Sequence, residues 1–284
     1  MEAGKIYTLT VLRETEIGYI LGNPKTVDEV FLHRNDCGNI TPKVGEKYQS
    51  FLYYDHKKRL CATLLTPKVT VFDCGFGTVR TVTHFGVFVD IGINKDILLS
   101  SDDLPKQRQL WPKEGDLVFG YLVNDSSGLL FELGSREDLE EIKKSAPKEL
   151  KGFKVKGRVI RIVDEGVNIY TDEGYLGFIH KSQIETPLRL GQEVMGRVIN
   201  VKDNGEINVS LLPQKEIAIK DDKKIILDYL MKHGGKMPLG DESTPEEIKQ
   251  VLNISKARFK RALGALLKQD KVYQSISKRE TYLK

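Results

Sequence analysis

Gly177-Phe178-Ile179-His180-Lys181-Ser182 is the clearest copy of a short pattern that occurs three times in this chain and decides its fold. The other two copies are Val30-Phe31-Leu32-His33-Arg34-Asn35 and Asp96-Ile97-Leu98-Leu99-Ser100-Ser101. Each copy lies between two glycines that begin strand-like segments and are 27, 29 or 25 residues apart: Gly18 and Gly45, Gly86 and Gly115, Gly166 and Gly191. Three segments with one order and similar spacing indicate a repeat protein in which each copy belongs to one structural unit.

Residues 1–213 consist mainly of short strand-like segments. Apolar and polar residues alternate over residues 155–162 and 194–199, which is the period of a strand buried on one face. Units of about 60–65 residues with four or five strands suit small closed barrels, because closure removes sheet edges that promote aggregation. We therefore predict a multidomain, mainly β fold with three tandem OB-fold barrels, at residues 1–67, 68–134 and 150–213.

Two segments of a different character complete the chain. Residues 135–149 begin with a potential capping residue, Ser135, and place acids before lysines, as the helix dipole favours, so we predict a linker helix. Within residues 214–284, the spacing predicts helices at 221–233, from Ser243 to about residue 253, and from residue 256 to about 269. Two strand-like runs follow. Three helices and a hairpin in this order are typical of an α+β winged-helix domain.

The repeated units resemble S1-motif RNA-binding domains, which are OB-type barrels. The residues that carry the resemblance are Gly86-Val87-Phe88-Val89 in the second unit, and 177–182 with the closing strand 207–211 in the third. The first unit is divergent. Three such units followed by a winged helix resemble the bacterial conserved virulence factor B family. The resemblance covers nearly the whole chain and implies an RNA-binding regulator.

Basic charge concentrates toward the C-terminal end, although the whole chain carries a net charge of only +4. Residues 215–284 contain 16 basic and 10 acidic residues, whereas the second unit contains 6 basic and 9 acidic residues. The third unit is nearly balanced, with 9 basic and 8 acidic residues. This asymmetry favours contact with a polyanion near the C-terminal end.

The remaining composition narrows the class of protein. No run of 18 apolar residues is present, and the first residues form no basic-then-apolar leader, so we expect a cytoplasmic protein without a membrane partner. Cys37, Cys61 and Cys74 are odd in number and lack metal-ligand spacing, which favours reduced thiols and no metal or other cofactor. Serial barrels need no symmetric partner, so we expect a monomer.

Two aromatics of the second unit are candidates for RNA binding. The resemblance places base-stacking aromatics of S1-type domains on the second and third strands, and the matching positions are Phe85 and Phe88, beside His84. Exposed aromatics stack on bases, whereas a single aromatic more often belongs to the core. Both interpretations stay open, although strand alternation puts Val87 and Val89 on the face opposite Phe88.

The third unit has Glu165 and Asn168 where the second has aromatics, and this puts base stacking there in doubt. It carries other candidate contacts for phosphates and bases: Arg158, Arg161, Tyr175, His180, Lys181 and Arg197. An alternative for His180 is a half-buried side chain that packs the barrel end. Since phosphate contacts supply most non-specific affinity, we expect this unit and the C-terminal domain to form the main binding surface.

Four cations lie on the third predicted helix of the C-terminal domain: Lys256, Arg258, Lys260 and Arg261. Lys278 and Arg279 occupy the expected tip of the wing. We expect phosphate contacts here, because winged-helix domains present these elements to nucleic acid. The alternative is a solvated helix face, as most charge runs are.

The sequence lacks the motifs of the common catalytic sites, including a phosphate loop, paired cysteines and Gly-x-Ser-x-Gly. We therefore expect a protein that binds single-stranded RNA and regulates gene expression, not an enzyme. DNA is the alternative partner, for a regulator led by the winged helix. A protein-interaction scaffold, whose acidic second barrel docks a basic protein, is a further alternative.

Overall fold

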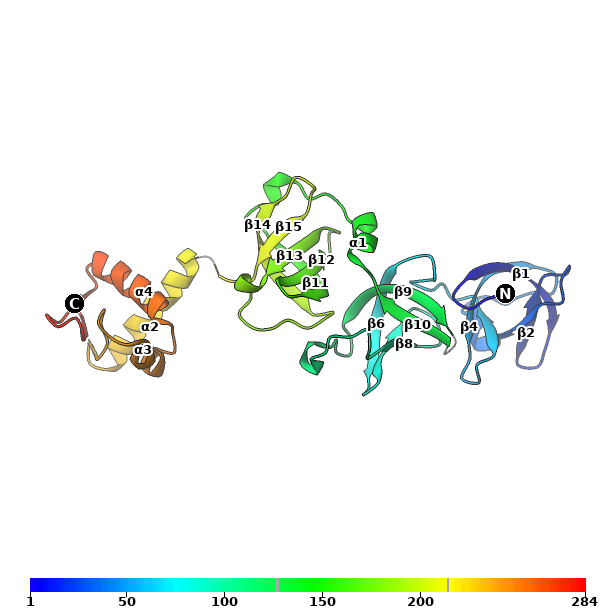
Figure 1. Ribbon diagram of the computed structural model, residues 1–284, viewed down its shortest axis with the longest axis horizontal. Helices are drawn as coiled ribbons and strands as arrows, with labels where there is room; N and C mark the ends of the chain where they lie inside the picture. The colour runs from blue at the N-terminus through cyan, green and yellow to red at the C-terminus, as the bar shows by residue number, and fades with distance from the viewer. Residues whose placement is uncertain (126–127, 214) are drawn as a thin grey trace. The chain divides into compact units, whose positions relative to one another are not determined.

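The computed structural model describes residues 1–125, 128–213 and 215–284, and divides into two compact units, Met1–Leu211 and Leu212–Lys284 (Figure 1). The first unit contains three closed five-stranded barrels, and the second contains three helices with a three-stranded sheet. The predicted fold class is therefore confirmed. The proposed domain boundary at residue 214 falls outside the described residues.

All three barrels have the same strand connectivity. Around each barrel the strands lie in the order first, second, third, fifth, fourth, and the third and fifth strands are parallel. The first barrel consists of β1 (Ile6–Glu14), β2 (Gly18–Gly22), β3 (Glu29–His33), β4 (Lys47–Tyr54) and β5 (Leu60–Thr63). The second consists of β6 (Gly75–Val82), β7 (Gly86–Asp90), β8 (Ile97–Ser100), β9 (Leu117–Asp125) and β10 (Gly128–Leu133). The third consists of β11 (Lys154–Val163), β12 (Gly166–Thr171), β13 (Leu176–His180), β14 (Glu193–Val201) and β15 (Ile207–Ser210).

The glycine that begins the second strand of each barrel is required by a close approach of two backbones. A Cβ on Gly18, Gly86 or Gly166 would lie 2.2, 2.2 or 2.1 Å from a carbonyl oxygen of the third strand. Gly86 and Gly166 also have φ values of 145° and 156°, which L side chains rarely adopt. Barrel geometry therefore explains these repeated glycines. They indicate the fold and are not evidence of a ligand-binding site.

Neighbouring barrels of the first unit share apolar and polar contacts. Phe51 and Tyr53 of the first barrel belong to the same buried cluster as Val87 and Val89 of the second. Between the second and third barrels, Asp116 accepts two hydrogen bonds of 2.9 Å from the guanidinium of Arg189. Apolar contacts therefore join the first barrel to the second, and an ion pair joins the second to the third.

The linker contains helix α1 (Arg136–Ile142), as predicted. The hydroxyl of Ser135 accepts a hydrogen bond from the Asp138 amide, and the Asp138 carboxylate accepts one from the Ser135 amide. This reciprocal capping box satisfies two amides that a short helix would otherwise leave unpaired.

The second unit has the helix, helix, helix and hairpin order predicted for a winged helix. Its elements are α2 (Lys215–Lys232), β16 (Lys236–Met237), α3 (Pro245–Leu252), α4 (Lys256–Lys268), β17 (Val272–Gln274) and β18 (Thr281–Leu283). Helix α2 begins earlier than predicted, and β16 was missed because two residues carry no periodic signal. Thr244 caps α3 immediately before Pro245, and the neighbouring Ser243 hydroxyl accepts a hydrogen bond from the Gly240 amide. Phe259, Leu263 and Leu266 of α4 are buried in the core.

Candidate nucleic-acid interface

One row of outward-facing residues crosses all five strands of the third barrel, and it is polar. The strand register pairs each member with the next: Arg161 on β11, Asn168 on β12, Phe178 on β13, Asn208 on β15 and Asn200 on β14. We call these five residues the polar row. Their strand neighbours Val167, Ile169 and Ile179 are buried in the barrel core, so alternation points the row outward.

The polar row combines an aromatic face, a cation and amides. Phe178 is half-exposed, Arg161 and Asn200 are exposed, and Asn168 is covered, with 7% of its surface exposed. An aromatic side chain can stack on any base, and asparagine amides can donate to and accept from base edges. The row therefore offers both kinds of contact that a single-stranded nucleic acid uses.

His180 and Lys181 extend this surface at the end of β13, and both side chains are exposed. The His180 Nδ1 accepts a hydrogen bond of 3.2 Å from the Ser182 amide and caps the short 3-10 helix Lys181–Gln183. Its ring centroid lies 6.4 Å from that of Phe178. The interpretation of His180 as a half-buried packing residue is wrong, because the imidazole faces solvent beside the aromatic.

Phe178 was not among the residues predicted to bind RNA. The prediction placed the stacking aromatics at the positions of Phe85 and Phe88, and the third barrel has Glu165 and Asn168 there. Phe88 of the second barrel pairs with Leu98, whereas Asn168 of the third pairs with Phe178. The aromatic therefore moves to the adjacent strand but stays in the same row. Its recurrence in Phe178-Ile179-His180 and Phe31-Leu32-His33 is the sequence signal that could have revealed it.

The equivalent row of the second barrel is apolar apart from one threonine. The register gives Thr81, Phe88, Leu98, Leu130 and Val123, which we call the apolar row. Phe85 lies next to it, 45% exposed, with its ring perpendicular to that of Phe88 at 5.9 Å. Both candidate aromatics are thus accessible, while the adjacent valines Val87 and Val89 are fully buried.

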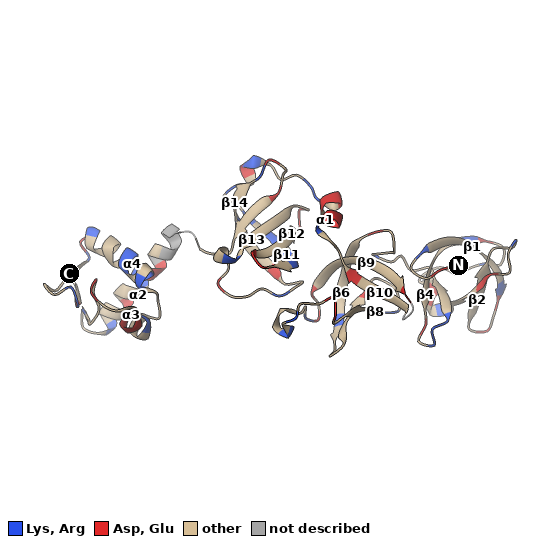
Figure 2. Cartoon of the chain, viewed as in Figure 1, with Lys and Arg blue, Asp and Glu red and all other residues tan. Residues whose placement is uncertain are grey.

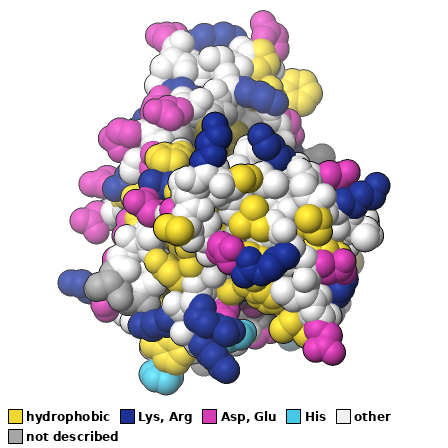
Figure 3. Space-filling model, turned by 90° about the vertical axis from the view of Figure 1, so that its right-hand side faces the viewer, with side chains coloured by type: hydrophobic (Ala, Val, Ile, Leu, Met, Phe, Trp, Pro, Cys, Tyr) yellow, Lys and Arg dark blue, Asp and Glu magenta, His cyan; other side chains and the backbone are white. Residues whose placement is uncertain are grey.

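The equivalent row of the first barrel is partly covered. It consists of Arg13, Ile20, Phe31, Cys61 and Tyr53, which we call the covered row. Cys61 and Tyr53 are buried in the cluster shared with the second barrel, and Arg13 makes a bidentate ion pair with Glu29 at 2.7 and 2.6 Å. On the face drawn in Figure 3, basic and acidic side chains are interspersed around apolar ones.

Three other candidates of the third barrel lie in different surroundings. Arg158 forms ion pairs with Asp172 at 2.6 Å and Glu193 at 3.4 Å, so its charge is balanced within the barrel. Tyr175 is half-buried and packs against the barrel core. Arg197 is half-exposed on the outer side of β14, opposite Lys154. Arg197 also pairs with Ser210, two residues beyond Asn208 of the polar row along β15.

The cations of α4 differ in their availability. Arg258 donates hydrogen bonds of 2.7 and 3.2 Å to Asp222 of α2, whose carboxylate is almost completely buried. This pair ties two helices together, so the position of Arg258 is explained by folding. Lys260 and Arg261 are exposed and Lys256 is half-exposed, so these three stay candidates for phosphate contact. Figure 2 shows basic positions along α4 and acidic positions on α3.

Within residues 1–125, 128–213 and 215–284, no group of His, Cys, Asp and Glu residues has the arrangement of a metal site. The three cysteines are free, and burial raises the pKa of the Cys74 thiol to about 11, so it stays protonated at neutral pH. Over the same residues, no helix is long and apolar enough to cross a membrane.

Three S1-type barrels, an exposed row that joins an aromatic to amides and a cation, and a winged helix define a multidomain nucleic-acid-binding protein. Family models match the chain in sequence: an S1 domain over 3–65, the CvfB first S1-like domain over 74–132, the second domain of virulence regulatory factor CvfB over 139–213, and the CvfB-like winged-helix domain over 224–283. The chain belongs to the conserved virulence factor B family.

Full-length relatives support this assignment. The chain is 37% identical to the uncharacterized protein YitL of Bacillus subtilis (strain 168), over 96% of this chain and 92% of that protein. It is 34% identical to conserved virulence factor B of Staphylococcus haemolyticus, over 93% of this chain and 89% of that protein. A crystal structure of a multidomain protein with nucleic acid binding domains from Streptococcus pneumoniae matches with a TM-score of 0.67 and 32% identity, covering 99% of this chain and 98% of that one.

Proposed function

We propose that this protein is an RNA-binding regulator of gene expression that holds single-stranded RNA on the polar row of the third barrel. The observation that carries the proposal is the position of Phe178 between the amides of Asn168 and Asn208, with Arg161 at the end of the row. Phe178 stacks on a base, Arg161 contacts a phosphate, and the accessible amides of Asn200 and Asn208 contact base edges.

RNA is preferred over DNA in this proposal because of the amides. An asparagine amide both donates and accepts hydrogen bonds, as the ribose 2′-hydroxyl does. Contacts to the 2′-hydroxyl are what let a protein distinguish RNA from DNA. The protein acts by binding, without catalysis, as a cytoplasmic monomer. The description of the matching family model, virulence regulatory factor CvfB, supports a regulatory role.

Substitution in the polar row tests the proposal. Phe178→Leu removes the π face and keeps apolar bulk, so affinity for a fluorescein-labelled oligouridine should fall by about 1–3 kcal/mol in fluorescence anisotropy. Phe31→Leu is the matched control, because Phe31 holds the same register position in the covered row. Equal losses in both variants, or no RNA binding by the wild type at low salt, would contradict the proposal.

A second candidate function is binding of duplex DNA by the winged helix. Lys260 and Arg261 favour it, since both are exposed on α4, the helix that winged-helix domains place in a groove. Competition between duplex DNA and single-stranded RNA of one sequence separates the two candidates. Under the RNA proposal, unlabelled duplex displaces the labelled RNA only weakly at equal nucleotide concentration.

A further inference from the structure

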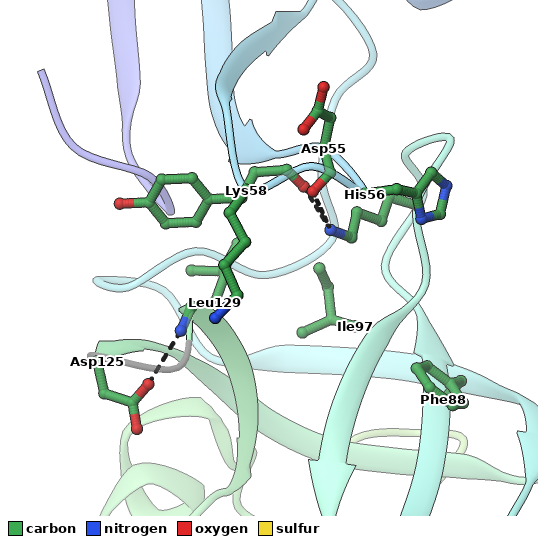
Figure 4. Close-up of a pocket in the computed structure, with 10 residues that line it drawn as sticks. Asp55, His56, Lys58, Phe88, Ile97, Asp125 and Leu129 are labelled. Carbon is green, nitrogen blue, oxygen red and sulfur yellow. Dashed lines mark hydrogen bonds between the residues drawn. The ribbon is translucent and has the colours of Figure 1, made fainter.

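A cavity of about 520 Å³ lies where the first and second barrels meet (Figure 4). Its lining comes from the end of β4 and the β4–β5 turn of the first barrel, and from β7, β8, the turn between them and residues 125, 128 and 129 of the second. A volume of this size suits a small ligand or one unit of a chain. None of the five residues of the polar row lines this cavity.

One side of the cavity is apolar and aromatic, and it comes from the second barrel. Ile97 and Leu129 line it together with Phe88 of the apolar row. Phe88 is half-exposed there, with Phe85 perpendicular to it at 5.9 Å. A flat π face at the edge of an open cavity is the feature on which an unpaired base stacks.

The other side carries the ammonium of Lys58 and the imidazole of His56, and it comes from the first barrel. His56 and Lys58 lie on the exposed β4–β5 turn and line the cavity, and within the described part of the chain neither side chain forms an ion pair. Asp55 also lines it, but its carboxylate accepts from the Arg59 amide at 2.9 Å and the Arg59 guanidinium at 2.8 Å. These contacts lower the pKa of Asp55 to about 2 and leave its charge balanced by Arg59.

Among the described residues of the second barrel, Lys95 is the cation that lines the cavity. This barrel is net acidic, with 6 basic and 9 acidic residues over 68–134. Its Arg80 is paired with Asp90 at 2.6 Å. Lys95 reaches the cavity, but its ammonium donates to the carbonyl oxygens of Tyr54 and Asp55, at 2.5 and 3.3 Å. Lys95 thus fastens the cationic turn against the second barrel. Asp125, at the opposite wall, accepts a hydrogen bond of 3.1 Å from the Gly128 amide.

We propose that this cavity is a composite binding site for one nucleotide of single-stranded RNA, with the base against Phe88 and its phosphate at Lys58. The inference rests on the proposed function, because it extends the RNA strand to a second contact beyond the polar row. The aromatic face and the Lys58 ammonium belong to different barrels. Neither barrel forms the site alone, and the contacts of Lys95 hold its two halves together.

Two matched pairs of variants of the full chain test the site, measured by anisotropy with a fluorescein-labelled oligouridine. Phe88→Leu should weaken binding roughly 5- to 150-fold, the loss expected for one stacked base, whereas Phe88→Tyr keeps the π face and binds like the wild type. Lys58→Gln should reduce the slope of log K against log salt by about 0.7, the value for one phosphate contact on a single strand. Lys47→Gln leaves the slope unchanged, because Lys47 begins β4, seven residues and roughly 24 Å from Tyr54 at the cavity end of that strand.

The outcomes separate this inference from the proposed function. If Phe88→Leu and Lys58→Gln bind the oligouridine with wild-type affinity while Phe178→Leu binds it more weakly, the composite site is wrong. The proposed binding of RNA on the polar row is then unaffected. Weaker binding by Phe88→Leu, unchanged binding by Phe88→Tyr and a smaller salt slope in Lys58→Gln together support the composite site, whereas an unchanged slope in Lys58→Gln overturns it. Absence of RNA binding by the wild type at low salt overturns both. Thermal unfolding monitored by circular dichroism confirms that each variant is folded, which the partial exposure of Phe88 leads us to expect.

Discussion

Glu206 should hold the linker helix α1 against the third barrel, and its replacement by glutamine should release that helix. The residue precedes β15, and its side chain is only 4% exposed. One carboxylate oxygen accepts from Arg136 at 2.5 Å and from Lys143 at 3.5 Å, and the other accepts from Lys202 at 2.9 Å. Two of these cations belong to α1 or its C-cap, so the carboxylate joins helix and barrel.

The expected magnitude follows from the shift in pKa. Burial alone would raise the pKa of Glu206, but the hydrogen bond from Lys202 and the nearby charges, including Arg136, lower it from 4.5 to about 2. Since one pKa unit corresponds to about 1.4 kcal/mol, the charged form stabilises the folded state by at most ~3 kcal/mol. The side chains of Arg136 and Lys202 are 41% and 40% exposed, and solvent screening lowers the figure to about 2 kcal/mol.

The contribution of Glu206 depends on pH in a defined direction. Its folded-state pKa is depressed, so the stabilisation is fully present above the unfolded value of 4.5 and is lost as pH falls toward 2. Multidomain chains do not unfold in a single step, so the assay is hydrogen exchange of the α1 amides. At pH 7, Glu206→Gln should exchange about 30-fold faster than the wild type, and the ratio should shrink near pH 3.

Asp203→Asn provides the matched control for this measurement. Asp203 lies on the same turn and pairs with Lys148 at 2.6 Å, but its side chain is fully exposed. Surface ion pairs contribute little, so exchange in α1 should stay close to the wild type. Equal exchange in the wild type and Glu206→Gln at pH 7, or a ratio that does not change with pH, would refute the reasoning.

Two further predictions concern buried ion pairs. Asp222→Asn should destabilise α2 against α4 by about 2–3 kcal/mol, because Arg258 loses its buried charged partner; hydrogen exchange in α2 measures this, and unchanged protection would contradict it. Asp116→Asn should weaken the contact between the second and third barrels by about 1–2 kcal/mol, since Arg189 loses a bidentate acceptor. Faster exchange at the start of β9 is expected, and unchanged exchange would mean that apolar contacts alone join these barrels.

The barrels could be predicted from the sequence because the repeated glycines are set by the backbone. Gly18, Gly86 and Gly166 sit where a Cβ would collide with the adjacent strand, so the chain must keep them wherever this barrel forms. The alternation that separates Val87 and Val89 from Phe88 is equally local. Both signals depend on residues close in sequence, and both are confirmed by the structure.

The site was harder to predict, because it depends on which side chains meet across strands and helices. Arg158 and Arg258 look like free cations in sequence, yet their partners Asp172 and Asp222 are 14 and 36 residues away. Phe178 was overlooked because the register, not the position in the motif, places it beside Asn168. A charge or an aromatic can be counted from sequence, but its availability is a property of the packed neighbours.

The three rows show that a repeated scaffold can carry different chemistry without changing its register. The polar row presents Phe178 among amides, the apolar row presents Phe88 among aliphatic side chains, and the covered row loses Cys61 and Tyr53 to the interface with the second barrel. The interface that removes part of one row also brings the Lys58 turn to the aromatic of the next. Because Lys95 and Asn94 of the second barrel bond to the first barrel at this junction, the packing of the barrels determines which side chains a ligand can reach.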